Sequence, residues 1–448
     1  MNTGERLHCI GIGGSGMAGL ARMAAQAGMQ VTGSDLQMPE RVYATHPFLR
    51  DAAIPVVPHD AANVPEQGIV VYSKAIPPEN VERAAAEHQP GVTLLSYGEA
   101  VMRFAQGKTL VAVAGTHGKS TTTAIIAHTL ERAGRKPSFV LGAKVPSLNN
   151  QSARYVAESD VFVLEADEYD RTFHAYRPTI AVVTNMDWDH MDTYPSFADV
   201  RESFATFLRT VEDGGTIVYC ADDERLYALI ENDLAPELHS RHITIQGYGL
   251  VRATADAWHP VVPLHGQHAQ LDALAAAHAC AAVGCTRAVI ETAFASFTGL
   301  ERRMQHLGSH GDAQVYSDYA HHPTELRATL DAAASQFPGR TLTVVFQPHQ
   351  RRRLTALYDD FVRVLRTVPR LHIVREFAVQ GRDDAHGMKS AGDLANALRE
   401  TNVDVAFHES IDDAASSLAS VVDAQSVLLI IGAGNVHDLA VRLVTAHP

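Results

Sequence analysis

The sequence is short of cysteine and of basic residues, and each shortage excludes a class of protein. Its four cysteines, at positions 9, 220, 280 and 285, have neither a metal-ligand spacing nor a disulfide framework, so we expect reduced packing residues. Lysine and arginine total 37 against 51 acidic residues. The resulting net charge of −14 argues against a nucleic-acid partner, because phosphate backbones require a basic surface.

Long apolar runs are also missing. No run reaches the length needed to cross a bilayer, and residues 1–6 lack the charged-then-apolar pattern of a signal peptide. We therefore expect no membrane partner and a cytoplasmic location. The 46% hydrophobic and 20% charged content fit a soluble α/β protein, and 448 residues favour about three domains.

The most informative segment is residues 111–123, which read VAVAGTHGKSTTT. Its apolar half predicts a buried strand, and Gly115 and Gly118 let backbone N–H groups converge on phosphate oxygens. Lys119 adds a mobile positive charge, and Ser120 supplies a hydroxyl for Mg²⁺. A plain glycine turn between strand and helix is the alternative, but it leaves Lys119 and Ser120 unexplained. We therefore expect a nucleoside triphosphate to bind here.

The first 35 residues predict a βαβ unit with a second glycine-rich loop. A strand over 7–12 leads into Gly13-Gly-Ser-Gly16, a helix runs to about residue 27, and a second strand covers 29–35. The glycines permit close approach of a phosphate to the helix N-terminus, and Asp35 is placed to meet a ribose hydroxyl. NAD and a UDP-sugar pose the same physical problem, so both ligands stay open at this point.

Later apolar runs predict three α/β units with boundaries at 1–106, 107–308 and 309–448. The expected strands cover 68–72 and 92–95 in the first unit, 109–114, 161–164 and 179–184 in the second, and 313–316, 341–346, 370–374, 403–407 and 426–431 in the third. Helices are expected over 269–283 and 288–297. In open parallel sheets ligands bind at the carboxyl ends of strands, so polar clusters there are candidates for chemistry.

Two acidic clusters follow strands of the middle unit. One reads EADEYD from Glu165, and the other covers 184–192 and includes His190. So many carboxylates beside a phosphate loop favour Mg²⁺, which prefers oxygen ligands and bridges ATP oxygens. A solvated acidic turn and a core or capping histidine are the alternatives. The position of both clusters at strand ends favours a functional role.

Basic residues gather in the last third of the chain. Arg302 and Arg303 form a pair suited to a phosphoryl group, although such pairs are often surface residues. The run from Asp318 to Glu325 follows a strand and predicts a helix start at Pro323. Residues 349–353 place a histidine and three arginines after another strand, which predicts a local trap for an anionic substrate. An exposed basic helix face is the alternative.

With these residues assembled, the chain resembles the Mur ligases of peptidoglycan synthesis almost end to end. The similar motifs are Gly11-Ile-Gly-Gly-Ser-Gly-Met17, Gly115-Thr-His-Gly-Lys-Ser120, Glu165-Ala-Asp-Glu168, Thr184-Asn185 through Asp192, Arg302-Arg303, Asp318-Tyr-Ala-His-His-Pro323 and Phe346-Gln-Pro-His349. The resemblance implies an α/β fold of three domains: a Rossmann-like UDP-binding domain, a central P-loop ATPase-type parallel sheet, and a Rossmann-like domain that binds the amino acid.

The resemblance also implies a reaction. ATP phosphorylates the carboxylate of UDP-N-acetylmuramate, and the amine of L-alanine attacks the acyl phosphate, with ATP as co-substrate and two Mg²⁺ ions as cofactors. Lys119, Arg303 and the two ions would stabilise the crowded negative charge. The implied site residues are, for catalysis, Lys119, His190, Arg303 and Glu165; for ATP, Gly115, Thr116, His117, Gly118, Lys119, Ser120, Thr121, His268, Asp272, Asp318 and Tyr319; for metal, Ser120, Glu165 and His190; for the UDP-sugar, Gly13, Gly14, Ser15, Gly16, Met17 and Asp35; and for the amino acid, His322, His349 and Arg353.

Three features bear on the branch of the family. Residues 195–208 contain no lysine, whereas members that add later residues often use a carbamylated lysine there. The family's adenine segment usually carries two asparagines, and this chain has Ala269 and Asp272 instead; an ionised Asp272 only accepts hydrogen bonds. Gln350 stands where the alanine-adding branch usually has arginine.

Other functions remain open. A recycling ligase that attaches a tripeptide to UDP-N-acetylmuramate shares the fold and is compatible with the acidic run. An NAD-dependent dehydrogenase would use the first glycine loop, and a non-catalytic nucleotide-binding protein would fit the altered adenine segment. The chain is expected to be a monomer or a homodimer.

Overall fold

The computed structural model of this chain describes residues 3–252, 258–378, 387–401, 403–418 and 425–445. Residues 1 and 2, part of the stretch in which no signal peptide is expected, lie outside the described residues. The chain divides into two compact units. The first comprises Met1–Asp187, Phe197–Pro263 and Leu271–Thr298, and the second comprises Trp188–Ser196, Leu264–Gln270 and Gly299–Pro448. Within the described ranges, no helix combines the length and apolarity that crossing a membrane requires.

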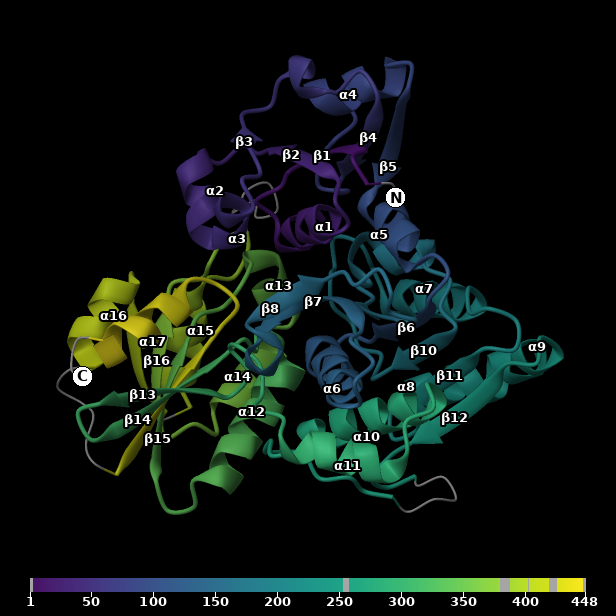
Figure 1. Cartoon of the computed structure of the whole chain (residues 1–448). Helices are drawn as coiled ribbons and strands as arrows, with labels where there is room; N and C mark the ends of the chain where they lie inside the picture. The colour runs from purple at the N-terminus through teal and green to yellow at the C-terminus, as the bar shows by residue number, and fades with distance from the viewer. Residues whose placement is uncertain (1–2, 253–257, 379–386, 402, 419–424, 446–448) are drawn as a thin grey trace. The chain divides into compact units, whose positions relative to one another are not determined.

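The first unit begins with a five-stranded parallel sheet in the order β3-β2-β1-β4-β5 (Figure 1). The strand β1 lies at its centre, so the glycine-rich segment after β1 emerges between the ends of β2 and β4. The strands are β1 (Arg6–Ile10), β2 (Gln30–Ser34), β3 (Val56–Val57), β4 (Gly68–Tyr72) and β5 (Val92–Ser96). The helices are α1 (Ser15–Gln26), α2 (Pro39–Thr45), α3 (Pro47–Asp51), η1 (Ala61–Asn63), α4 (Val81–His88) and α5 (Tyr97–Ala105).

The second sheet of this unit has seven strands in the order β12-β11-β10-β6-β9-β7-β8, all parallel except the β7–β8 pair. Its strands are β6 (Thr109–Ala114), β7 (Ser138–Val145), β8 (Gln151–Arg154), β9 (Val161–Glu165), β10 (Ile180–Val183), β11 (Thr216–Cys220) and β12 (Thr244–Tyr248). The helices are α6 (Lys119–Arg132), η2 (Pro146–Leu148), η3 (Tyr169–Ala175), α7 (Phe197–Arg209), α8 (Glu224–Tyr227), η4 (Ala228–Leu234), α9 (Ala235–Ser240), α10 (Gln267–Ala282) and α11 (Arg287–Ala295). The first residues of α10, up to Gln270, belong to the second unit. The side chains of β6 from Val111 onward are fully buried, as expected of a central strand covered on both faces.

The second unit holds a six-stranded sheet in the order β13-β14-β18-β15-β16-β17, in which only β13 runs antiparallel to its neighbour. Its strands are β13 (Gln305–His310), β14 (Ala313–Asp318), β15 (Thr341–Phe346), β16 (Arg370–Val374), β17 (Asp404–His408) and β18 (Ser426–Ile431). Its helices are α12 (Pro323–Gln336), α13 (Arg351–Ala356), α14 (Tyr358–Leu365), α15 (Ala391–Arg399), α16 (Ile411–Leu418) and α17 (Val436–Thr445).

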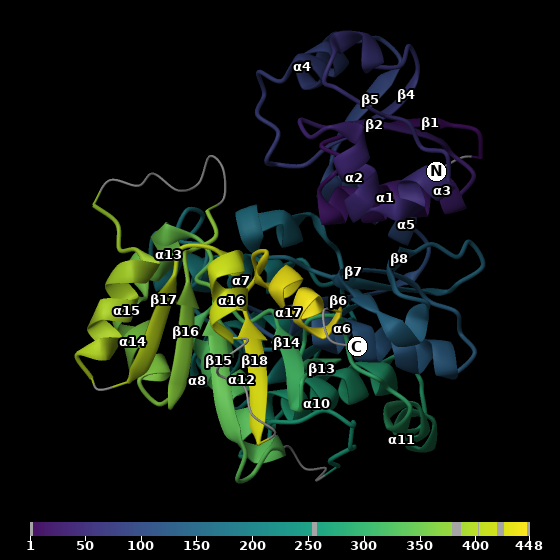
Figure 2. The same cartoon turned by 90° about the vertical axis from the view of Figure 1, so that its left-hand side faces the viewer.

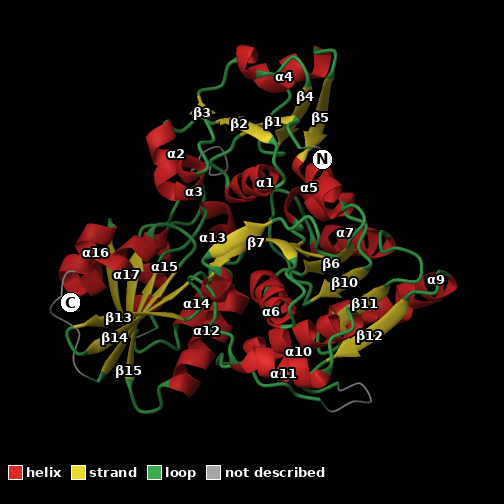
Figure 3. Cartoon of the chain, viewed as in Figure 1, coloured by secondary structure: helices red, strands yellow, loops and turns green. Residues whose placement is uncertain are grey.

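Helices cover both faces of this third sheet. Residues of α12 to α15 share one buried cluster with the strands, and residues of α16 and α17 share another. Figure 2 shows α16 and α17 in front of the strands, and Figure 3 shows helices on both sides of the fan of strands. The expected α/β class with parallel-rich sheets is therefore confirmed.

Many predicted elements agree closely with the structure. The bounds of β4, β6, β15, β16 and β18 equal the expected ones, and α12 begins at Pro323 with Glu325 in its first turn. The sequence analysis did not predict β3, β7, β8, β11, β12 or β13. The central strand β6 lies between β10 and β9, so the phosphate loop, the residues after β9 and residues 184–187 after β10 follow the carboxyl ends of adjacent strands, as expected.

Candidate active site

The phosphate loop joins β6 to α6 and requires glycine at two positions. Gly115 has φ of 134°, and a Cβ atom there would lie 2.0 Å from Thr184 Oγ1. Gly118 is the N-cap of α6 with φ of 82°, and a Cβ there would lie 2.3 Å from Asp272 Oδ1. Both backbones occupy the left-handed region and are closely approached by side chains. No other residue type fits either position without rearrangement.

Residues that follow β10 brace this loop from the side. The amide of Asn185 accepts a hydrogen bond from His117 N through Oδ1 at 2.9 Å and donates to His117 O through Nδ2 at 2.9 Å. The hydroxyl of Thr184 donates to His117 O at 2.5 Å. The brace is electrically neutral and satisfies both backbone groups of the residue at the loop's tip.

The side chain of Lys119 lies against the loop and forms several polar contacts. Its Nζ donates to Gly115 O at 2.7 Å and Thr116 O at 3.2 Å, and lies 2.7 Å from Glu168 Oε2. The side chains of Lys119 and Glu168 are 12% and 3% exposed. Burial alone would lower the pKa of Lys119, but the neighbouring carboxylates, led by Glu168, raise it well above its ordinary value. The ammonium is therefore permanently charged where the phosphates are expected.

An oxygen pair suited to magnesium lies beside it. Ser120 Oγ donates to Glu165 Oε1 at 2.9 Å, and Gly142 N donates to the other carboxylate oxygen at 2.6 Å. Burial raises the pKa of Glu165, and the charge of Lys119 opposes that rise. Hydroxyl and carboxylate oxygens are the ligands that Mg²⁺ prefers, so these residues fit the predicted ion. His190 belongs to the second unit, with φ of 54°, and its place at a second ion stays a prediction.

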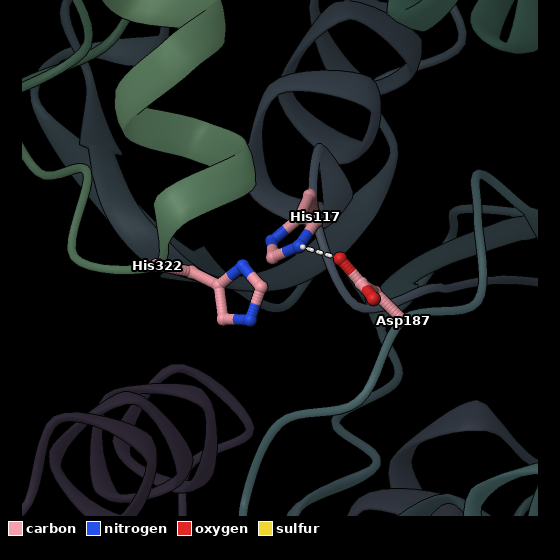
Figure 4. A group of neighbouring side chains, drawn as sticks. All are labelled: His117, Asp187 and His322. Carbon is pink, nitrogen blue, oxygen red and sulfur yellow. Dashed lines mark hydrogen bonds and ion pairs between the residues drawn. The ribbon is translucent and has the colours of Figure 1, made fainter. Parts of the chain in front are cut away.

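A contact between a histidine and a carboxylate in the first unit involves the loop residue His117. His117 Nε2 lies 3.4 Å from Asp187 Oδ2, and Asp187 Oδ1 lies 3.3 Å from Arg225 Nη1. Figure 4 shows the His117 imidazole pointing at this carboxylate; His322, also drawn there, belongs to the second unit. Asp187 N also donates a hydrogen bond to the Thr116 hydroxyl oxygen at 2.8 Å. The tip of the loop is thus fixed to the strand end by several polar contacts.

The two residues predicted to contact adenine, Asp272 and His268, belong to different units. Asp272, on α10, packs its carboxylate against Gly118, and it is 6% exposed. The acid that replaces the second asparagine therefore touches the phosphate loop itself. His268 belongs to the second unit, where burial lowers its pKa. Thr121 lies in the first turn of α6, one residue after Ser120.

The first glycine loop is braced by a carboxylate. Asp35 follows β2 and accepts hydrogen bonds from Gly13 N at 2.8 Å and Gln37 N at 2.9 Å. Gly14 is the N-cap of α1. Ser15 and Gly16 are exposed. Met17 is buried, with 3% of the residue exposed, and its contact with the UDP-sugar stays a prediction.

In the second unit, Arg353 forms a buried bidentate ion pair. Its Nε and Nη2 donate to Asp189 Oδ1 and Oδ2 at 2.8 and 3.1 Å, and the two side chains are 4% and 5% exposed. Burial would raise the pKa of Asp189, but Arg353 and His190 hold it well below its ordinary value. Two of the three guanidinium nitrogens are thus engaged by a protein carboxylate. The third, Nη1, lies 3.4 Å from His349 Nδ1.

The rest of the basic segment is also paired or packed. Arg351 forms an ion pair with the buried Glu376, so two of the three arginines in the predicted anion trap are neutralised by acids. The His349 ring stacks on Phe377 with centroids 5.6 Å apart and planes 7° apart. Gln350, which lies between His349 and Arg351 in the sequence, has φ of 68°, a strained backbone conformation for a residue other than glycine.

His322 caps the N-terminus of helix α12 in the second unit. Its Nδ1 accepts a hydrogen bond from Thr324 N at 3.2 Å as the N-cap of α12, and Glu325 completes a capping box. With Nδ1 as acceptor, the proton lies on Nε2, which is 3.3 Å from Trp188 O. The ring is 4% exposed. The predicted amino-acid contact of His322 therefore competes with this capping role.

The remaining predicted residues meet at the ends of β14 and β18. Arg302 Nη2 donates to the carbonyls of Gly432 and Gly434, and the guanidiniums of both Arg302 and Arg303 lie over the Tyr319 ring. Arg303 Nη1 lies 3.6 Å from Glu325 Oε1. Asp318 is 4% exposed, and its carboxylate accepts from Met304 N, Ala320 N and Thr329 Oγ1. The structure thus brings Arg303, Tyr319 and Asp318 together, with Asp318 already held by three donors.

Sequence comparison identifies the family to which most of the chain is similar. Three family models match in order: the Mur ligase family catalytic domain over residues 6–109, the Mur ligase middle domain over 113–259, and the Mur ligase glutamate ligase domain over 302–434. The UDP-N-acetylmuramate–L-alanine ligase of Acidithiobacillus ferrooxidans is 35% identical over 463 residues, covering 98% of this chain and 97% of the relative. The enzyme of the same name from Burkholderia ambifaria is 35% identical with the same coverage.

Structure comparison agrees on the fold. The UDP-N-acetylmuramate–alanine ligase MurC of Thermotoga maritima superposes with a TM-score of 0.79 at 24% identity, covering 99% of both chains. A murein peptide ligase from Psychrobacter arcticus superposes with a TM-score of 0.67 at 22% identity, covering 99% of this chain and 98% of the other.

Proposed function

The chain belongs to the Mur ligase family, and we propose on that basis that it uses ATP to join L-alanine to the carboxylate of UDP-N-acetylmuramate, the first amino-acid addition in peptidoglycan precursor synthesis. The observation that carries the proposal is 35% identity over 98% of the chain to relatives named for this reaction. The phosphate loop with Lys119 and Ser120 supplies the ATP chemistry that the reaction requires.

The reaction has two balanced steps. A carboxylate oxygen of the sugar attacks the γ-phosphorus of ATP and ADP leaves, so an acyl phosphate forms. The amine of L-alanine then attacks the acyl carbon, loses a proton and expels inorganic phosphate, leaving an amide. No covalent bond to the protein is required, so positioning and charge stabilisation are the tasks of the side chains.

Lys119 is the residue best placed for the first step. Its ammonium rests on two loop carbonyls and on Glu168. Phosphate oxygens would take the place of Glu168 as its anionic partner. Ser120 and Glu165 would hold the Mg²⁺ bound to ATP, and when bound the ion neutralises phosphate charge. His190 is proposed for the second ion.

The other proposed contacts are distributed by unit. Residues 1–106 would bind the UDP-sugar through Gly13 to Met17 and Asp35, residues 107–308 would bind ATP, and residues 309–448 would bind the amino acid. Within the last set, His349 and the Nη1 edge of Arg353 would receive the carboxylate of L-alanine, since the other edge of Arg353 faces Asp189. Arg303 and Tyr319 would contact the nucleotide. The reaction would take place in the cytoplasm, where ATP is supplied.

The tripeptide-adding ligase is the second candidate, since a murein peptide ligase shares the fold. Phosphate release by the purified protein distinguishes the two. It should require ATP, Mg²⁺, UDP-N-acetylmuramate and L-alanine together, and the product should gain the mass of one alanyl residue. Release with the tripeptide and none with L-alanine would refute the proposal. Glycine and L-serine, tested in parallel, would define the selectivity of the amino-acid site.

A further inference from the structure

A fully buried carboxylate lies beneath the first glycine loop, far in sequence from any residue of the proposed site. Glu82, in the first turn of α4, is 0% exposed. One of its oxygens accepts from the Ser34 hydroxyl and lies 2.8 Å from His59 Nδ1. The other accepts from Asn63 Nδ2 at 2.7 Å and lies 3.5 Å from His8 Nε2. Residues of β1, of β2 and of the stretch 59–63 therefore meet at this single side chain of α4.

The environment keeps this carboxylate ionised. Burial alone would raise the pKa of Glu82, but its hydrogen bonds from His8, Asn63, Ser34 and His59 lower it to about 2. His8 is itself fixed from the other side, since its Nδ1 lies 2.8 Å from Thr32 Oγ1. A buried charge with this many partners resists reorientation, because moving it would leave several polar groups unsatisfied.

The cluster is connected to the loop through one residue. Ser34 donates its hydroxyl to Glu82, and its carbonyl accepts hydrogen bonds from Gly11 N at 2.8 Å and Ile12 N at 3.0 Å. The next residue, Asp35, holds Gly13 N with its carboxylate. Three consecutive backbone N–H groups at the start of the loop thus depend on the end of β2, and Glu82 fixes that end by its side chain.

The end of β2 and the first glycine loop are packed too closely for a side chain at either glycine between them. A Cβ atom on Gly33 would lie 2.5 Å from Ile12 Cδ1, and one on Gly13 would lie 2.7 Å from Asp35 Oδ2. Because the end of β2 and the loop leave no room for a side chain at these glycines, a shift of Ser34 would displace the loop backbone.

We propose that Glu82 is a positioning residue for the UDP-sugar: by anchoring Ser34 and the end of β2, it holds the first glycine loop in the conformation that receives the diphosphate. This inference rests on the proposed function. Glu82 would act through Ser34 and not by touching the substrate, and its effect would be confined to the binding of one of the three substrates.

The test compares three variants. Glu82→Gln keeps the size of the side chain but replaces one acceptor by a donor that faces existing donors, and Ser34→Ala removes the hydroxyl that links Glu82 and His59 to the end of β2. Glu87→Gln is the matched control, because Glu87 lies on the same helix with its side chain 45% exposed. For each, steady-state kinetics gives kcat and the KM of all three substrates. Calorimetry with UDP gives binding without turnover, and thermal melting reports folding.

We expect Glu82→Gln to raise the KM of UDP-N-acetylmuramate and the Kd of UDP about tenfold, equivalent to about 1.4 kcal/mol. Ser34→Ala should raise both by a smaller factor. The KM of ATP, the KM of L-alanine and kcat at saturation should stay unchanged in both variants. A role limited to folding would instead lower the melting temperature and the active fraction while leaving the KM of the UDP-sugar unaltered.

Several outcomes would overturn the inference. They are a folded Glu82→Gln protein with the wild-type KM for the UDP-sugar, an equal rise in the Glu87→Gln control, or an equal rise in the KM of ATP. If Glu82→Gln does not fold, Ser34→Ala decides the matter, and a wild-type KM in that variant refutes the inference. Failure of the wild-type chain to bind UDP would refute the proposed function and this inference together, whereas the other outcomes leave the proposed function intact.

Discussion

The two glycine-rich loops of the first unit share a backbone plan but differ in charge. Each follows the central strand of a parallel sheet, opens a helix, and is braced by a residue from the end of the neighbouring strand. The first loop is braced by the carboxylate of Asp35, and the second by the neutral amide of Asn185. Only the second loop carries a cation, Lys119.

The difference follows from what each loop is proposed to hold. A triphosphate brings more negative charge than a diphosphate sugar, so a neutral brace and a lysine suit the second loop. A carboxylate brace is tolerable where the ligand carries less charge and offers a ribose hydroxyl as donor. The same strand–loop–helix plan would therefore serve two ligands, and the side chains at the strand ends would make the choice.

The substitution with the largest expected effect removes the cation of the second loop. Lys119→Ala should lower kcat at least about a thousandfold, because it deletes the charge that faces the transferred phosphoryl group. Since it also leaves the buried Glu168 without its ammonium, the variant should melt at a lower temperature. Phosphate-release assays with melting curves measure both effects. Arg132→Ala, an exposed cation at the other end of α6, is the control. Near-normal turnover in Lys119→Ala would remove the proposed distinction between the loops.

Alanine substitution of the N-cap glycines of α6 and α1 should affect the two loops differently. Gly118→Ala places a Cβ 2.3 Å from Asp272 Oδ1 at φ of 82°, so backbone strain of about 1–3 kcal/mol and weaker ATP binding are expected. Gly14→Ala, at φ of −72° and with only Gly11 O at 3.5 Å, should cost less than about 0.5 kcal/mol. Calorimetric titration with ATP and UDP gives both affinities. Equal losses in the two variants would contradict the expected asymmetry.

Exchanging the braces gives a reciprocal test. Asn185→Asp loses the donor to His117 O and adds charge beside the triphosphate, so the KM of ATP should rise about tenfold. Asp35→Asn loses one of two acceptors for backbone N–H groups, so the KM of UDP-N-acetylmuramate should rise by a similar or smaller factor. Each variant should leave the KM of the other nucleotide unchanged. A rise in both KM values from one substitution would show that the loops are not independent.

The smallest expected effect is a loss of stability at acidic pH, where Glu82 becomes protonated. The pKa of Glu82 is lowered from its ordinary value of 4.5 to about 2 in the folded chain. Its contribution to stability is therefore present above pH 4.5 and is lost as the pH falls toward 2. Between pH 7 and pH 4 the loss should be about 1 kcal/mol. Melting of the wild type and of Glu82→Gln should converge over this range, and parallel curves would be inconsistent with an ionised Glu82.

The sequence was sufficient for elements whose pattern is strong. The strands β6 and β18 are continuous apolar runs, and α12 begins with proline followed by an acid, so their limits could be predicted. The strands β8 and β13 could not, because their polar sequences QSAR and QHLGSH follow no apolar period. Both are edge strands paired antiparallel to one neighbour, which is a property of the tertiary fold.

For the candidate site, the sequence identified groups of residues but not their partners. The acids near Glu165 and the phosphate loop were expected to converge, and they do. The sequence did not indicate that Lys119 would pair with Glu168 or that Arg353 would pair with Asp189, because such pairings depend on which strand ends adjoin. Glu82 carries no signal at all: in an amphipathic helix it is indistinguishable from a surface acid until the neighbouring sheet covers it.

The buried pair between Asp189 and Arg353 spans 164 residues of chain within the second unit. At typical rates of translation, the ribosome adds the arginine roughly ten to thirty seconds after the aspartate. During that interval the segment Trp188–Ser196 has left the tunnel without the helix that completes its surroundings, while most of the first unit is already present. The order of synthesis thus delays completion of the second unit, and a chain that stops before α13 would contain Asp189 without its counter-charge.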